Sequence, residues 1–295
     1  MKNILEALKQ KILPLVLAVM MPLGVYTPAK TEISSAPQKS ENAVRVVSFN
    51  LRCNNDIYGF VKNRGKFVSA ALENYAPDSF GVQEATKAWL DILDSSLGEK
   101  YARVGEPRDS AKNTEYSAVY YRIDKYELVD EGTIWLSETP DKFGSKSYLA
   151  SMPRICTWAT LKNKESGLVY THINTHLDFL VEYTRSKQAD VLLKKIEELK
   201  GRGPVVCTGD FNADEKTGTY KKMTAALDDS RLVAKETESG KTYHNYGRGD
   251  LFHSTAIDFI FVTKGTEVER YKIMKDTVDG MYLSDHYAIM ADICF

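Results

Sequence analysis

The chain has 295 residues, of which 43% are hydrophobic and 27% are charged, and this is typical of one large α/β domain or two small ones. Its formal net charge is −1 at neutral pH, and becomes −3 when Lys2, Lys9, Lys11 and Glu6 at the N-terminus, which together carry +2, are left out. A mildly acidic protein has no global attraction for a polyanion, so the charge argues against a tight, non-specific binder of duplex DNA.

The first 27 residues are predicted to be a secretory signal peptide. Three lysines precede an apolar stretch at residues 12–25 that contains two prolines, and a Ser-, Lys- and Glu-rich spacer follows at residues 28–42. The apolar stretch is too short and too rich in proline for a membrane span. We therefore expect export to the periplasm or the exterior, cleavage between about residues 25 and 36, a disordered spacer, and one domain at residues 43–295. An uncleaved anchor is the alternative.

The four cysteines, Cys53, Cys156, Cys207 and Cys294, show no C-x-x-C spacing. A zinc site is therefore not indicated. The last three lie in apolar, strand-like sequence, where a free cysteine behaves as a small buried hydrophobe. An exported protein could also pair its cysteines, and the sequence leaves the disulfide state open.

The start of the domain is predicted to alternate strands and helices. Strands are expected at residues 43–49 and 79–82, and helices at residues 64–75 and 86–97. The helices follow from the spacing of their apolar residues, and Pro77 ends the first of them.

The rest of the domain is richer in strands. Aromatic and β-branched runs predict strands at residues 116–121, 126–136, 155–161, 168–174, 205–208, 257–263 and 287–294. Amphipathic helices are expected at residues 182–200 and 219–227, a hairpin turn at 162–167 and a polar loop at 236–255. The many predicted strands, with helices between them, indicate two stacked sheets with helices outside, an α/β (α+β) fold.

Polar side chains suited to catalysis stand at the ends of several predicted strands. They are Asn50, Glu84, His176, Asp210 with Asn212, Asp258, and Asp285 with His286. Gly209, directly before Asp210, lets the backbone approach a ligand closely. Each residue alone has a structural explanation, such as an Asx turn, a helix cap, a solvated carboxylate or a core histidine. Together they form the inventory that hydrolysis of a phosphate ester needs.

The residue types follow from that chemistry. Negative charge grows on the phosphoryl oxygens in the transition state, so a divalent metal ion on Glu84 and Asn50 would stabilise it, and protonated His286 would add a second positive donor. Asp210 is the best placed base for attack by water. Asp258 is the carboxylate expected to keep His286 protonated.

Six ordered motifs carry a resemblance to a known family. They are Ser48-Phe49-Asn50-Leu51, Val82-Gln83-Glu84, Asn174-Thr175-His176, Thr208-Gly209-Asp210-Phe211-Asn212, Ile257-Asp258-Phe259-Ile260-Phe261 and Ser284-Asp285-His286. On these motifs the chain resembles the endonuclease/exonuclease/phosphatase superfamily, which contains deoxyribonuclease I, apurinic endonucleases, inositol-polyphosphate 5-phosphatases, sphingomyelinases and deadenylases. Six motifs in the family's order, over nearly the whole domain, are far more specific than one short pattern.

The resemblance implies a four-layer αββα sandwich with its active site at one edge of the two sheets. It assigns Asn50 and Glu84 to binding Mg²⁺, or alternatively Mn²⁺, and Asp285 to a place near a second metal. His176 would contact phosphate or act as an acid. The remaining assignments are Asp210 and Asn212 to orienting water and phosphate, and Asp258 to holding His286.

Two further segments, Glu115-Tyr116-Ser117 and Pro153-Arg154-Ile155, resemble the bacterial, exported branch of the superfamily. Tyr116 and Arg154 are therefore candidate substrate contacts, although Arg154 is equally well explained as a surface salt-bridge residue. Many relatives carry a basic residue where this chain has Ala256, and the loop at residues 242–250 is aromatic and polar. Both features weaken the case for a polyanionic substrate.

The sequence thus predicts a secreted or periplasmic, Mg²⁺-dependent phosphoesterase, which we expect to be a monomer without a membrane span in its mature form. Cleavage of a phosphodiester and of a phosphomonoester both stay open, and so does the substrate: nucleic acid, nucleotide, sugar or inositol phosphate, or phospholipid head group. The alternative is a non-catalytic ligand- or carbohydrate-binding protein on the same fold. It has no need of the metal and acid–base residues together.

Overall fold

The computed structural model describes residues 33–53, 61–250, 252–253, 255–278 and 280–295. The predicted signal peptide and the first residues of the predicted spacer lie outside this part of the chain. Within the described residues, no helix is long and apolar enough to cross a membrane.

Two sheets of six strands each form the centre of the domain. The first contains, in spatial order, β11 (Glu267–Met274), β14 (Ala288–Cys294), β1 (Val44–Asn50), β2 (Ser79–Thr86), β4 (Glu115–Arg122) and β3 (Tyr101–Val104). The second contains β5 (Tyr126–Trp135), β6 (Ile155–Asn163), β7 (Val169–His176), β8 (Val205–Asp210), β10 (Asp258–Thr263) and β9 (Leu227–Asp229). A small hairpin joins β12 (Thr277–Val278) to β13 (Met281–Tyr282).

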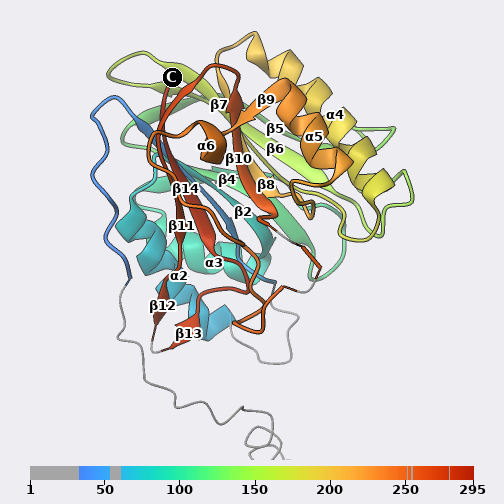
Figure 1. Cartoon of the computed structure of the whole chain (residues 1–295), viewed down its shortest axis with the longest axis horizontal. Coiled ribbons are helices and arrows are strands. Elements are labelled where there is room, and N and C mark those ends of the chain that lie inside the picture. The colour runs from blue at the N-terminus through green and yellow to red at the C-terminus, as the bar shows by residue number, and fades with distance from the viewer. Residues whose placement is uncertain (1–32, 54–60, 251, 254, 279) are drawn as a thin grey trace, which may run out of the picture. The chain divides into compact units, whose positions relative to one another are not determined.

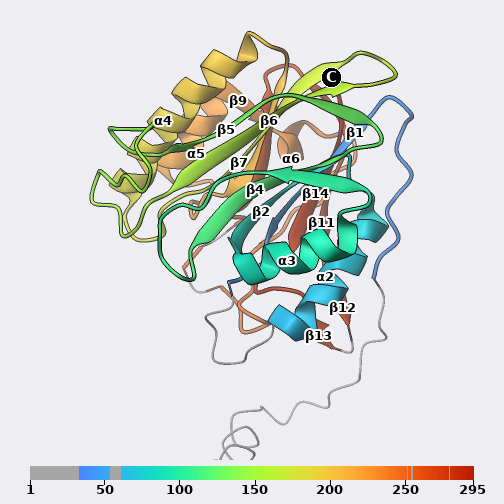
Figure 2. The ribbon, with the colours of Figure 1, turned by 180° about the vertical axis from the view of Figure 1, so that it is seen from behind.

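Helices cover the outer faces of both sheets. The described helices are α2 (Val61–Tyr75), α3 (Lys87–Leu97), α4 (Glu182–Lys200), α5 (Gly218–Ala226) and the short α6 (Ser230–Val233). Figures 1 and 2 show α2 and α3 outside the first sheet, and α4 and α5 outside the second. Since each sheet must bury one face against helices and the other against its neighbour, this gives the four layers of an αββα sandwich. The predicted fold class is confirmed.

Alternating side chains divide the apolar core into three clusters. In β1, Val47 and Phe49 pack toward α2 and α3, while Val44 and Val46 belong to the cluster between the two sheets. A third cluster lies between the second sheet and α4 and α5. Because both faces of the central strands are buried, their backbones are fixed where they end at the edge that carries the polar motifs.

Strand direction brings those motifs together. β1 runs parallel to β2, with Asn50 opposite Gln83, and β7 runs parallel to β8, with His176 opposite Asp210. β10 runs antiparallel to β8, so Asp258 at its start pairs with Asp210 at the end of β8. Parallel strands end at the same edge of a sheet, so four strand ends and one strand start meet there.

A buried polar layer joins the two sheets just beneath this edge. Gln83 Nε2 donates to Asn174 Oδ1 (2.6 Å) and Ser48 Oγ (3.0 Å). The ring nitrogens of His172 lie 2.8 Å from Ser79 Oγ and 2.8 Å from Thr208 Oγ1. Burial lowers the pKa of His172 to about 3, so the ring is neutral. This layer fixes the spacing of the sheets that carry the polar motifs.

The structure differs from the predicted elements in several places. β3, β9, β11, β12, β13 and α6 were not predicted. β2 extends beyond Val82 to Thr86 through a β-bulge between Val82 and Ala85. Cys156, Cys207 and Cys294 are free thiols.

Residues 33–42, expected to be a disordered spacer, lie against the domain over their described length. Ile33 packs against the core cluster beneath α2 and α3, and the backbone nitrogen of Ser34 donates to Asp276 Oδ1 (2.7 Å). Arg45 Nη2 donates to the carbonyl of Pro37 (2.6 Å). Contacts of this kind order the segment, contrary to the expectation from its composition alone.

Candidate active site

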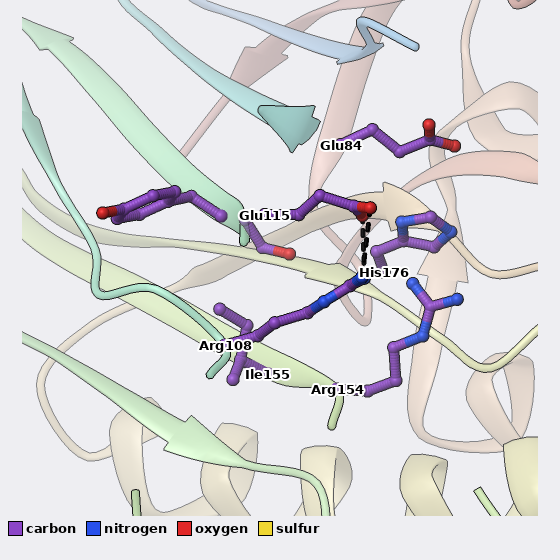
Figure 3. A pocket seen from close by; sticks show the side chains of 8 residues that line it. Glu84, Arg108, Glu115, Arg154, Ile155 and His176 are labelled. Carbon is purple, nitrogen blue, oxygen red and sulfur yellow. Dashed lines mark hydrogen bonds and ion pairs between the residues drawn. The ribbon is translucent and has the colours of Figure 1, made fainter. Parts of the chain in front are cut away.

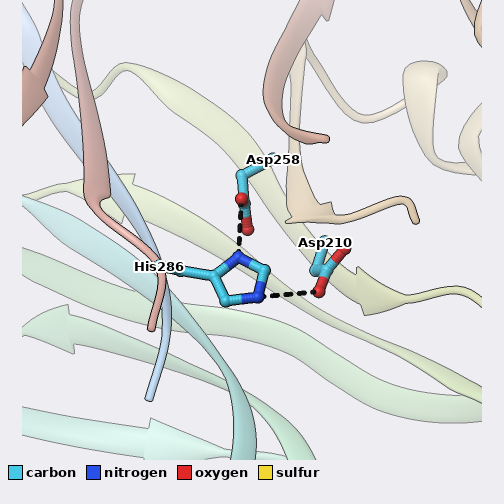
Figure 4. Close-up of side chains that lie close together, drawn as sticks. All are labelled: Asp210, Asp258 and His286. Atoms are coloured by element: carbon cyan, nitrogen blue, oxygen red, sulfur yellow. Dashed lines mark hydrogen bonds and ion pairs between the residues drawn. The ribbon is translucent and has the colours of Figure 1, made fainter. Parts of the chain in front are cut away.

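Three buried side chains from three elements form the centre of the site. His286, just before β14, donates from Nδ1 to Asp258 Oδ2 over 2.8 Å, and its Nε2 lies 3.8 Å from Asp210 Oδ2. Figure 4 shows the imidazole ring between the two carboxylates. The predicted partnership of Asp258 and His286 is therefore present in the structure.

The charges of these groups shift one another's pKa. Burial alone would lower the pKa of His286, but the charge and hydrogen bond of Asp258, together with Asp210 and Asp285, raise it to about 10. Burial and the charge of Asp258 raise the pKa of Asp210 to about 7, against the opposing effect of His286. At neutral pH the ring is thus an imidazolium, and Asp210 is poised between its acid and base forms.

Glu84 reaches the site because of the bulge in β2. Its φ is 54°, in the left-handed region that a residue with a side chain rarely adopts, and a bulge re-aims the side chain that it displaces. Asn50 Nδ2 donates to Glu84 Oε1 (3.2 Å) and to Asp210 Oδ2 (2.9 Å). Asn50, Glu84 and Asp210 thus converge from both sheets.

The carboxylate of Glu84 is the ligand of this group that suits a hard divalent cation by its charge. Burial opposes ionisation of Glu84, but the backbone hydrogen bond from Cys53 and the charge of Arg52 outweigh it and lower the pKa of the carboxyl group. An ionised carboxylate beside an amide is the donor set that Mg²⁺ and Mn²⁺ prefer. Glu84 therefore suits the predicted metal. Asn50 turns its amide nitrogen toward Glu84 and Asp210, and its Oδ1 accepts from the backbone N–H of Arg52, so its amide would have to turn over to offer oxygen to the metal.

A second group, Asp210, Asp258 and His286, also offers ligand atoms, all within 4.8 Å of one another. We assign this group to proton transfer instead. His286 Nδ1 is already bonded to Asp258, and an imidazolium cannot ligate a cation.

His176 and Asn212 form a second polar pair beside Asp210. Asn212 has φ 47°, a conformation that asparagine tolerates better than most residues. Its Nδ2 donates to His176 Nε2 (3.0 Å) and to the carbonyl of Leu177 (3.1 Å). Burial and the charges of Arg154 and Arg108 hold the pKa of His176 well below its usual value, so this histidine is neutral.

Asp285 lies beside this group with a cationic neighbour. Its Oδ2 is 3.6 Å from Nη1 of Arg52, and burial raises the pKa of its carboxyl group. Arg52 itself has φ 57° and donates its backbone N–H to Asn50 Oδ1 (3.0 Å). Arg52 therefore supplies positive charge where the resemblance implies a second metal, and the role of Asp285 stays a prediction.

We call Asn50, Glu84, Asp210, Asp258 and His286 the catalytic cluster. A pocket opens next to it, lined in part by Glu84 and His176 (Figure 3). Arg154 lies in it and is only 5% exposed, so its interpretation as a surface salt-bridge residue is wrong. Tyr116 also lines the pocket, but its ring packs against the core cluster beneath α2 and α3, so its role as a substrate contact stays a prediction. Ser117, the next residue of β4, points to the opposite face of the strand and also lines the pocket.

Three residues near the site were not singled out from the sequence. Arg52 lies beside Glu84 and Asp285, and Arg108 lines the pocket. The ring of Tyr243 lies 4.9 Å from the ring of His286, with the two backbones paired in an antiparallel bridge. The sequence shows that the loop at residues 242–250 is aromatic, but the contact of this loop with His286 joins residues far apart in the chain, and no local pattern predicts it.

The matched family agrees with this fold and site. The model of the Endonuclease/Exonuclease/phosphatase family matches residues 47–286, which contain every residue of the catalytic cluster. The chain therefore belongs to the endonuclease/exonuclease/phosphatase family, as its motifs predicted. Members of this superfamily are phosphoesterases, and membership supports hydrolysis of phosphate esters.

Solved structures give the same result. An endonuclease/exonuclease/phosphatase from Bacteroides vulgatus is 33% identical, with a TM-score of 0.79, over 86% of this chain and 99% of that one. The mannosyl-6-phosphatase of Bacteroides thetaiotaomicron VPI-5482 is 31% identical, with a TM-score of 0.78, over 85% of this chain and 100% of that one.

A curated relative is more distant. The RNA exonuclease NGL1 of Saccharomyces cerevisiae is 18% identical over 48% of this chain, and the match spans 52% of the yeast protein. The chain thus covers about half the length of that relative.

Proposed function

We propose that this protein is a divalent-metal-dependent hydrolase that cleaves a phosphate ester by attack of water. The observation that carries the proposal is the position of His286 between Asp258 and Asp210. One carboxylate holds the ring as an imidazolium, and the other stands across from it with a pKa of about 7, suited to accept a proton.

The proton-transfer roles follow from these pKa values. Asp210 Oδ2 takes a proton from the attacking water, because near neutral pH its carboxyl group is partly ionised. His286 cannot be the base, because its pKa of about 10 keeps it protonated. Its Nε2–H instead donates to a phosphoryl oxygen or to the leaving group, while Asp258 fixes the ring from the other side.

The remaining residues position the phosphate. Neutral His176 offers a hydrogen bond rather than charge, so we assign it to phosphate contact and not to acid catalysis. Asn212, whose amide group donates to His176 and to the carbonyl of Leu177, holds that ring in place. Asn50 and Glu84 would hold Mg²⁺ or Mn²⁺. The cation would stabilise the negative charge that develops on the phosphoryl oxygens.

The relatives bear on the substrate. One solved structure with 31% identity is a mannosyl-6-phosphatase, and this similarity makes a sugar phosphate the leading candidate substrate. The net charge of −1 gives no support to a large polyanion. A sugar phosphate or another small phosphate ester is the substrate that these two observations favour.

A substrate panel tests the proposal. Nucleic acids, nucleotides, sugar and inositol phosphates and sphingomyelin are incubated with the protein in Mg²⁺, in Mn²⁺ and in a chelator. We expect metal-dependent turnover of at least one ester, loss of that turnover with chelator, and loss by more than about 10²-fold in Asp210→Asn. Asp91→Asn, on the exposed side of α3, is the matched control and should keep full activity.

Turnover that survives both chelator and Asp210→Asn would refute the assignment of the reaction to this site. Binding of a sugar or glycan without turnover of any ester would instead favour a non-catalytic binding protein on this fold.

A further inference from the structure

The pocket beside the catalytic cluster contains a buried arginine, Arg154, to which no carboxylate of the described residues bonds directly. Arg154 is 5% exposed and its Nε has no hydrogen-bond partner. Among the described residues, no hydrogen bond or ion pair to its guanidinium group is found. Burial and the charge of Arg108 lower the pKa of Arg154, and the charges of Glu115, Asp178 and Asp210 oppose this shift without reversing it. A buried charge without a bonded partner is destabilising, so a ligand anion is the expected partner.

The far wall of the pocket is a rigid ion pair. Arg108 donates from Nη1 and Nη2 to the two carboxylate oxygens of Glu115, over 2.7 Å and 3.0 Å. Trp135 Nε1 donates to the backbone carbonyl of Arg108 (2.7 Å) and so fixes the segment that carries it. A bidentate pair of this kind has a fixed geometry. Arg108 thus has a carboxylate bonded to it directly, whereas Arg154 has none among the described residues.

The pocket is continuous with the catalytic cluster. Glu84 and His176 line it together with Arg108 and Arg154, and Figure 3 shows both guanidinium groups directed toward the side where His176 lies. The charges of both arginines act on His176. A phosphoryl group at Asp210 and His286 thus has the imidazole of His176 and the guanidinium of Arg154 on its pocket side.

We propose that Arg154, backed by the Arg108–Glu115 pair, binds a non-bridging oxygen of a terminal phosphate, so that the preferred substrate is a phosphate monoester. A monoester has three non-bridging oxygens and nearly two negative charges at neutral pH, whereas a diester has two such oxygens and one charge. The third oxygen can accept from a buried guanidinium. The second ester branch of a diester would carry a carbon chain toward Arg154 and the Arg108–Glu115 pair instead. This inference rests on the proposed function and selects among its substrates.

The test compares two esters with the same leaving group. 4-Nitrophenyl phosphate is the monoester, and methyl 4-nitrophenyl phosphate differs from it by one methyl group on a non-bridging oxygen. We expect kcat/KM to favour the monoester in the wild type. In Arg154→Met, which keeps the length of the side chain and removes its charge, kcat/KM for the monoester should fall by about 10²–10³-fold. For the methyl diester it should fall by less than about 10-fold.

Controls separate this role from a structural one. Arg122→Ala, at the last residue of β4, where the guanidinium pairs with Asp124, should leave both rates unchanged. Arg154→Lys should regain part of the monoester activity, because it restores the charge without the planar fork. Inorganic phosphate should bind the wild type at least about 10-fold more tightly than Arg154→Met in calorimetry. The melting temperature of Arg154→Met should be equal to or above that of the wild type, because the substitution removes a buried charge without a bonded partner.

The possible results separate the monoester inference from the proposed function. A wild type that prefers the methyl diester, or an Arg154→Met variant that loses both activities equally, would overturn the monoester inference alone. Absence of metal-dependent turnover for these two esters and for every ester of the substrate panel would overturn the proposed function, and the inference with it.

Discussion

Asp210 and Asp258 face the same imidazole from two sides, and each carboxylate acts on the other as well as on His286. The charge of Asp258 raises both the pKa of His286 and the pKa of Asp210. Asp258 thus influences the protonation of both Asp210, the proposed base, and His286, the proposed proton donor. Activity should need Asp210 ionised and His286 protonated, which defines a window from about pH 7 to about pH 10.

Replacing Asp258 by asparagine should move this window. Loss of the carboxylate charge lowers the pKa of Asp210 and the pKa of His286 together, so both limbs of the pH profile should shift to lower pH. Measuring kcat/KM from about pH 5 to pH 10 for both proteins checks this. Limbs at unchanged pH would show that Asp258 has only a structural role.

The same shifts predict the effect of pH on stability. The raised pKa of His286 contributes stability that is complete below the unfolded value of 6.5 and is lost as the pH rises through about 10. The raised pKa of Asp210 acts in the same sense, because the folded state holds this proton more tightly, and the stability falls as the pH rises from the unfolded value of 3.8 to about 7. Both effects disfavour the folded protein at alkaline pH.

Glu84 is the second residue whose role can be isolated. Glu84→Gln should weaken Mg²⁺ binding by more than about 10-fold, since a neutral amide is a poorer ligand and loss of even an outer-shell group costs that much. Calorimetric titration with Mg²⁺ measures it directly, and kcat/KM at limiting Mg²⁺ should fall with it. Glu73→Gln, an exposed glutamate of α2, is the control. Equal affinities for the wild type and Glu84→Gln would remove Glu84 from the metal site.

At the scale of elements, the site depends on how closely the two sheets approach. Gly81 of β2 faces the second sheet, and a Cβ built there would lie 2.5 Å from Asn174 Oδ1. That contact is far shorter than van der Waals distance, and Asn174 is already bonded to Gln83. Only glycine therefore allows β2 to lie against the polar layer that positions Glu84.

Gly81→Ala should destabilise the protein by about 1–3 kcal/mol, the usual effect of overpacking a core. The free energy of unfolding in urea measures the effect. Gly201→Ala is the matched control, because φ at Gly201 is −63° and the nearest atom to a Cβ there is 3.8 Å away. Equal unfolding free energies for the two variants would show that the sheets can separate without penalty.

The elements also show what the sequence can and cannot predict. Strands such as β8 and helices such as α3 are long or strongly apolar, and their patterns identified them. β11 escaped detection because a bulge between Val268 and Arg270 breaks the alternation that marks a strand. β3 has four residues, too few for a period. The strand-end residues could be predicted as a set because parallel strands share an edge, but the pairing of Arg108 with Glu115 depends on side-chain directions that no local pattern records.

At the scale of the whole molecule, the described start of the chain is tied to the domain. Ile33 packs beneath α2 and α3, Ser34 bonds to Asp276, and Asn74 Nδ2 donates to the carbonyl of Ser34 (2.5 Å). We propose that the protein is exported and that the signal peptide is cleaved before Ile33. Cleavage after Ser34 would leave the carboxylate of Asp276, which is 4% exposed, without this backbone partner.

Mass spectrometry of the mature protein from an exporting host locates its N-terminus. We expect it between residues 25 and 33. Recovery of intact Met1 from the cytoplasm would contradict export, and a start after Ser34 would contradict the role given to these contacts.

We propose that side chains from both sheets act as one catalytic unit. His286 precedes β14 of the first sheet and Asp258 begins β10 of the second, so their hydrogen bond joins the two sheets at the site. If the pair acts as a unit, removing either member removes the function of both.

The most direct measurement is kcat/KM for the wild type, Asp258→Asn, His286→Ala and the double mutant. Each single substitution should lower kcat/KM by about 10²–10⁴-fold, as expected for a positioned acid–base group. The double mutant should be scarcely worse than the worse single mutant. Losses that multiply in the double mutant would show that the two residues act independently, and would contradict the claim.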